Sequence, residues 1–149
     1  MRRTSIADLV VPFLAVGIVG YLLLREFYES LPPFQWYAAV PIAALAAVEF
    51  VLAPRVRAAV RHDPAAKPMA ALAIARSVAL GKASSLCGSA LTGASVALLL
   101  KVAPDASRAS AASHDLRVSL IIIAASVVLL GAGLVLERAG VDPNSDLRR

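Results

Sequence analysis

The sequence has few of the residues from which disulfides, metal sites and catalytic centres are built. Its 149 residues include one cysteine, Cys87, and two histidines, His62 and His114. A single cysteine excludes a disulfide within the chain, and we expect Cys87 to be a small buried residue and not a reactive thiol. Neither histidine has cysteines or carboxylates around it at the spacing of metal ligands, so both are expected to lie in solvated loops, His114 together with Asp115. The sequence therefore predicts no metal site and no cofactor.

Charge is also scarce. Charged residues make up 17% of the chain against 59% hydrophobic residues, and the mean hydropathy is +0.75. A soluble domain would carry more charge and less aliphatic surface. No catalytic or nucleotide-binding motif occurs, and no pair of groups has a recognisable acid, base or nucleophile arrangement. We therefore expect an integral membrane protein that is not an enzyme.

Four apolar runs are long enough to cross a bilayer, which takes about twenty mainly apolar residues. They cover residues 6–24, 34–53, 82–100 and 118–136. Nothing breaks a helix between Pro68 and the third run, so the third helix is expected to extend back to about residue 68. The sequence predicts an all-α, four-helix membrane domain over residues 1–138. Residues 139–149 are expected to form a polar, disordered cytoplasmic tail.

The distribution of Lys and Arg predicts the orientation. The net charge of +5 could suggest a nucleic-acid-binding protein, but cytoplasmic loops of membrane proteins are enriched in the same residues. Basic residues gather before the first run, over residues 55–67 and in the tail, whereas the opposite side carries Arg25, Lys101, Arg108 and Arg117. Aromatic residues gather on that opposite side, between Tyr21 and Tyr37, as expected for an interfacial belt. Both termini are therefore predicted to lie in the cytoplasm, with no nucleic-acid partner.

Small residues form a stripe along the third run at spacings of three and four residues. The stripe consists of Ser77, Gly81, Ser84, Gly88, Thr92 and Ser95. In an α-helix this spacing defines one narrow face, and small residues let another membrane helix approach closely. Ser119, Ser126 and Gly133 offer the fourth run as its partner. Hydroxyl groups lining a water-filled path are the alternative, but glycines without carboxylates or amides favour packing.

Four ionisable residues are expected at one level near the cytoplasmic edge of the membrane: Asp8, Glu49, Arg76 and Lys82. The first two runs should form an antiparallel hairpin through a short loop, and the second and third should be antiparallel neighbours. Glu49 is then expected to pair with Lys82 or Arg76, because an unpaired carboxylate among apolar residues is costly. Such a pair would fix the register of the helices, or the cluster would move substrate or protons.

Short motifs give the sequence a family resemblance. They are GYLLL at Gly20–Leu24, LPP at Leu31–Pro33, Glu49 followed by RVRA at Arg55–Ala58, and ALAIARSVALGKAS at Ala71–Ser84. Together they resemble a family of small four-helix actinobacterial membrane proteins, domain of unknown function 3180, whose genes commonly lie beside folate-biosynthesis genes. The resemblance covers nearly the whole chain and implies a bacterial plasma membrane. It implies no activity.

Two functional classes follow from these expectations. The first is a non-enzymatic accessory or assembly subunit, whose partners are the lipid bilayer and either another membrane protein or a second copy of the chain. The second is a small oligomeric transporter or a flippase for a lipid-linked substrate, which would use Glu49, Arg76 and Lys82 in a cavity.

Overall fold

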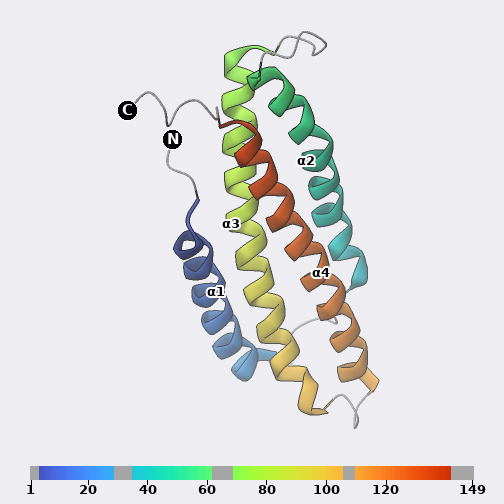
Figure 1. Cartoon of the computed structure of the whole chain (residues 1–149). Coiled ribbons are helices and arrows are strands. Elements are labelled where there is room, and N and C mark those ends of the chain that lie inside the picture. The colour runs from blue at the N-terminus through green and yellow to red at the C-terminus, as the bar shows by residue number, and fades with distance from the viewer. Residues whose placement is uncertain (1–3, 29–34, 62–68, 106–109, 142–149) are drawn as a thin grey trace.

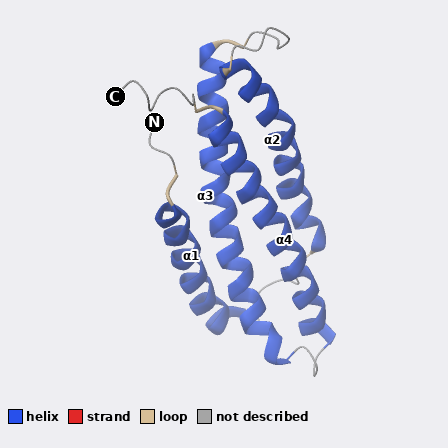
Figure 2. Ribbon diagram, viewed as in Figure 1, coloured by secondary structure: helices blue, strands red, loops and turns tan. Residues whose placement is uncertain are grey.

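The computed structural model describes residues 4–28, 35–61, 69–105 and 110–141. Within these residues the chain is all-α, without a strand, as Figure 2 shows. The elements are α1 (Ile6–Phe27), η2 (Trp36–Ala38), α2 (Ala39–Val60), α3 (Ala71–Val102), η3 (Ala103–Asp105) and α4 (Ser110–Ala139). Four helices, one for each predicted run, are long and apolar enough to cross a membrane. The prediction of a four-span helical membrane bundle is confirmed.

The helices are longer than the apolar runs that predicted them. α2 continues past residue 53 to Val60, and α4 begins at Ser110 and not near residue 118. Arg55 and Arg57, expected in a loop, lie on the last turns of α2, where Val56 is fully buried. Hydropathy marks only the part of a helix that lies in lipid, whereas packing continues the helix beyond it.

The start of α1 is fixed by a capping box. The hydroxyl of Ser5 accepts a hydrogen bond from the backbone N–H of Asp8 at 3.3 Å, and the Asp8 carboxylate accepts one from the backbone N–H of Ser5 at 2.8 Å. This reciprocal pair satisfies N–H groups that would otherwise lack a partner at the helix end. Asp8 therefore has a local structural role.

The helices follow one another in space in the order α1, α3, α4, α2 (Figure 1). α3 and α4 pack along each other at the centre, α1 packs on α3, and α2 packs mainly on α4. α1 and α2 lie at opposite edges, and among the described residues they make no contact. The expected hairpin of neighbouring first and second helices is therefore wrong, because each has a better partner in the central pair.

Side-chain packing between α2 and α4 occurs in two clusters. Ala46 packs with Leu129 and Ala132 in one cluster, with Ile42 beside them. The other cluster, nearer the C-terminal end of α2, consists of Ala53, Val56, Leu136 and Ala139. Glu49 lies on the same face of α2 between the two clusters, three residues after Ala46 and four before Ala53.

The orientation prediction depends partly on residues outside the described ranges. These are residues 1–3, 62–68, 106–109 and 142–149. Most of the predicted disordered tail is among them, but its first residue, Ala139, is the buried last residue of α4. The described ends nevertheless agree in one respect, since Thr4 bonds directly to Glu137 near the end of α4. The beginning of α1 and the end of α4 therefore lie at the same end of the bundle.

Candidate functional site

The stripe of small residues on α3 faces the interior of the bundle. Ser77, Gly81, Ser84, Gly88 and Ser95 are buried, and Thr92 is half-buried. A methyl group added at Gly88 would lie 2.8 Å from the backbone nitrogen of Leu130 and 2.9 Å from the carbonyl oxygen of Ser126. Such distances leave no room for a side chain, so α3 and α4 touch through their backbones at this level.

A second crossing between α3 and α4 lies nearer the end where α3 begins. A Cβ atom at Gly133 would lie 2.5 Å from the Gly81 carbonyl oxygen and 2.7 Å from the backbone nitrogen of Ser85. A Cβ atom at Gly81 would in turn lie 2.7 Å from the Gly133 carbonyl oxygen. The two glycines are therefore in reciprocal contact.

Two hydroxyl groups of the stripe, those of Ser77 and Thr92, bond within their own helix. Ser77 donates to the carbonyl oxygen of Ala73 at 2.9 Å, and Thr92 donates to that of Gly88 at 2.7 Å. Ser85, beside the stripe, donates to the carbonyl oxygen of Lys82 in the same way. Because these hydroxyls bond to the backbone of their own helix, and glycines of the stripe contact α4, the stripe favours helix packing and not a water-filled path.

A second face of α3, which the sequence analysis missed, contacts α1. The Ser89 hydroxyl donates to the carbonyl oxygen of Leu9, and Gly93 lies directly against the backbone of α1 at Phe13 and Gly17. Ser89 and Gly93 are four residues apart, so the signal was present in the sequence as a second pair of small residues on one face of the helix. Cys87, expected to be buried, is instead exposed on the surface of α3.

The four expected cluster residues do not converge. Asp8 belongs to the cap of α1, with Lys82 close enough to act on its charge, while Arg76 is exposed. Glu49 is 0% exposed and makes no ion pair with Lys82 or Arg76. The expected pairing is wrong because α2 packs on α4, so α3 presents its Lys82 face to α1.

Glu49 is the most unusual polar residue in the described part of the chain. Both of its carboxyl oxygens are buried without a hydrogen-bond partner there. The Ser84 side chain on α3 is a polar group close to Glu49, although it lies outside hydrogen-bond geometry. A buried polar atom without a partner costs free energy, and an unpaired buried charge costs far more.

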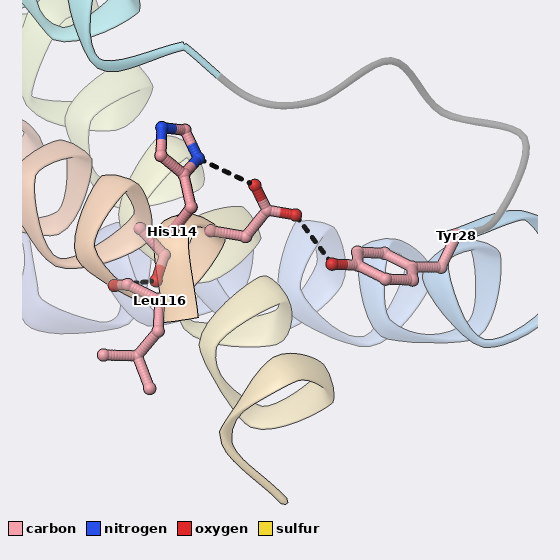
Figure 3. A network of polar contacts seen from close by, with 5 residues as sticks. Tyr28, His114 and Leu116 are labelled. Atoms are coloured by element: carbon pink, nitrogen blue, oxygen red, sulfur yellow. Dashed lines mark hydrogen bonds and ion pairs between the residues drawn. The ribbon is translucent and has the colours of Figure 1, made fainter. Parts of the chain in front are cut away.

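Two further buried carboxylates, both missed by sequence reasoning, hold the α1 segment to α4. At one end, Glu137 is 5% exposed and accepts two hydrogen bonds from Thr4. One comes from the Thr4 backbone N–H at 2.7 Å, and the other from the Thr4 hydroxyl. At the other, Asp115 is 6% exposed and accepts a bond from the Tyr28 hydroxyl at 2.6 Å (Figure 3). Asp115, expected in a solvated loop, is thus a buried helical residue.

His114 contributes to the same polar contact from an exposed position. Its Nδ1 atom lies 3.4 Å from Asp115 Oδ1, on the opposite side of the carboxylate from Tyr28 (Figure 3). Among the described residues, no group of three His, Cys, Asp or Glu residues could hold a metal ion. The hydrogen bond of this network joins Tyr28, which directly follows α1, to Asp115 on α4.

An apolar groove runs between α1 and α3 on the side of the glycine contact. Its volume is about 280 Å³, and its lining includes the two contact glycines, Gly17 and Gly93. The other lining residues are Phe13, Leu14, Ile18, Tyr21, Leu22, Val96, Ala97 and Leu100. Because glycines form part of the groove, side chains that would fill it in an ordinary helix pair are missing.

Comparison with known proteins places the chain in one family. The model of the family described as "Protein of unknown function (DUF3180)" matches residues 9–143. The chain belongs to the DUF3180 family. The match includes all of α2, α3 and α4 and most of α1, so it covers the glycine contacts described above and Glu49. No curated protein and no solved structure matches this DUF3180 protein.

Proposed function

We propose that this DUF3180 protein is a non-enzymatic accessory or assembly subunit of the plasma membrane, which binds the apolar transmembrane helix of another protein. The observation that supports this function best is the apolar groove between α1 and α3. α1 is one of the two edge helices of the bundle, and none of its most apolar 18-residue window is buried.

The groove fits a helix better than a polar solute. Helices in lipid gain little from hydrophobic association and depend on close van der Waals packing, for which glycine-containing surfaces are suited. Gly17 and Gly93 bring the backbones of α1 and α3 close together and leave an apolar recess beside them. A bulky side chain from a partner helix would fill this recess.

Photocross-linking in cells tests the proposal. A photoreactive residue is placed at Ile18, which lines the groove, and at Val128, which is 48% exposed on α4 outside it. A discrete protein adduct from position 18 that is absent from position 128 is the expected result. Adducts to lipid alone, or the same adducts from both positions, would contradict the proposal.

A groove-filling substitution supplies the matched variant. Val96→Phe places a larger side chain in the groove, and Val128→Phe makes the same change on the exposed surface of α4. We expect the first to remove the co-purifying protein after extraction in mild detergent and the second to retain it.

A second candidate function is that of a small oligomeric transporter or flippase. The observation that favours it is the buried, unpaired carboxyl group of Glu49, since ionisable groups inside membranes often mark transport pathways. Lys82 and Arg76 do not face this group, so the Glu/Arg/Lys cavity would have to form in another conformation. Substrate or proton flux through reconstituted vesicles, abolished by Glu49→Gln, would support transport over the accessory function.

A further inference from the structure

Glu49 lies in a place where an ionised carboxylate has nothing to stabilise it. Its side chain is 0% exposed, and neither carboxyl oxygen has a hydrogen-bond partner in the described part of the chain. An isolated carboxylate in an apolar interior is so costly that the group takes up a proton or a cation instead.

The charged groups on the surrounding elements are engaged elsewhere or point away. On α3, the positive charge of Lys82 lies close enough to the Asp8 carboxylate to interact with it, and Arg76 is exposed. On α4, Glu137 accepts two hydrogen bonds from Thr4. Two further basic residues, Arg55 and Arg57 on α2, are exposed, and η2 carries no charged residue. None of these residues neutralises Glu49.

We propose that Glu49 is a proton-binding site within the membrane, and that the bound proton holds α2 against α4. The Ser84 hydroxyl on α3 lies close to Glu49, and a neutral hydroxyl is a better neighbour for a carboxylic acid than for an unpaired charge. A metal cation would need several oxygen ligands, and no group of three His, Cys, Asp or Glu residues suitable for metal binding occurs among the described residues.

The position of Glu49 couples the proton to helix packing. The residue separates the two packing clusters between α2 and α4, one around Ala46 and one around Ala53. α2 has few contacts with α3 and none with α1 in the described residues, so its attachment depends on this face. Loss of the proton would create a charge inside the contact, and α2 would have to move to let water reach it.

Infrared difference spectroscopy tests for the proton directly. The spectrum of the Glu49→Gln variant is subtracted from that of the wild-type protein over a pH series in detergent micelles. We expect a protonated-carboxyl band in the wild type at neutral pH, absent from the variant and disappearing as the pH rises. Glu26→Gln is the control, because Glu26 is exposed at the end of α1, and the band should persist in it.

Thermal unfolding tests the coupling to α2. Glutamine resembles the protonated acid, so the unfolding temperature of Glu49→Gln should match that of the wild type at acidic pH and exceed it increasingly as the pH rises. Replacement of choline by Na⁺ at constant ionic strength should leave both proteins unchanged.

Three results would overturn the inference. One is the absence of a protonated-carboxyl band attributable to Glu49 at any pH. Another is a difference in unfolding temperature that stays the same across the pH range. The third is stabilisation of the wild type, but not of Glu49→Gln, by Na⁺, which would identify a cation site. Each result leaves the proposed binding of a partner helix at α1 untouched, because that function does not involve Glu49.

Discussion

At the scale of single residues, the bundle depends on glycines at positions where neighbouring backbone leaves no room even for a methyl group. Gly133 and Gly131 are two positions apart on α4, but they face different surroundings. A Cβ atom at Gly133 would lie 2.5 Å from the Gly81 carbonyl oxygen, whereas one at Gly131 would meet no atom within 4 Å. The difference lies in which face of α4 meets α3.

Gly133→Ala should therefore destabilise the protein, because the added methyl group forces α3 and α4 apart. We expect a cost of about 1–3 kcal/mol from overpacking. The control, Gly131→Ala, should be neutral or stabilising by up to about 1 kcal/mol, since alanine has the higher helix propensity. Thermal unfolding in detergent micelles measures both, and equal stability of the two variants would show that the crossing is looser than described.

Tyr28 and Asp115 offer a second test at the residue scale. Tyr28→Phe removes the hydroxyl that donates to Asp115 at 2.6 Å and leaves a nearly buried carboxylate short of a donor. The expected loss of stability is about 1–3 kcal/mol. Tyr21→Phe is the matched control, since Tyr21 is 42% exposed, and the same unfolding assay should find it close to the wild type.

At the scale of elements, α1 is held differently from the other helices. It contacts α3 through the Gly17–Gly93 crossing and is tied to α4 at each end by the residues that flank it, Thr4 and Tyr28. α3 and α4, in contrast, pack along their length and form the centre of the bundle. A change at the α1–α3 crossing should thus act on α1 alone.

Gly93→Ala places a methyl group against the Phe13 carbonyl oxygen, closer than van der Waals contact allows. We expect faster amide hydrogen exchange in α1, with α4 unchanged, because local contacts set local opening. Gly20→Ala is the control, as its Cβ atom would make an ordinary contact of 3.8 Å with Ala97. Faster exchange throughout the bundle would mean that α1 and the central pair open together.

At the scale of the whole molecule, the charged ends distinguish the two sides of the membrane. The end of the bundle where α3 begins carries basic residues from two other helices. They are Arg55, Arg57 and Arg61 at the end of α2, and Arg138 in the last turn of α4. The opposite end carries Arg25 on α1, Lys101 on α3 and Arg117 on α4. This arrangement supports a cytoplasmic location for the first end.

A fusion at the C-terminus tests this orientation. A fluorescent protein attached there should be fluorescent, and alkaline phosphatase attached there should be inactive, because we expect this end in the cytoplasm. Phosphatase fused after Pro104, between α3 and α4, should be active. Active phosphatase at the C-terminus would contradict the proposed orientation.

Hydropathy, helix period and charge were enough to predict the helices of this protein and one of its packing faces from the sequence alone. They predicted four helices, the stripe on α3 from Ser77 to Ser95, and α4 as a candidate partner. These are local properties: an apolar run and a spacing of three and four residues can be recognised wherever the chain goes. Packing beyond the lipid-facing segment left no such signal, so α2 and α4 extend further than predicted.

Only the tertiary structure decided which helices are neighbours and which polar groups meet. The sequence placed Glu49 and Lys82 at one level, but α4 lies beside α2 and α3 turns Lys82 towards α1. Asp115 and Glu137 looked like ordinary residues near helix ends, yet each meets a donor from the segment containing α1. These contacts join residues 87 and 133 positions apart in the chain. Such pairs depend on how helix surfaces fit and rotate against one another, which no local pattern of residues specifies.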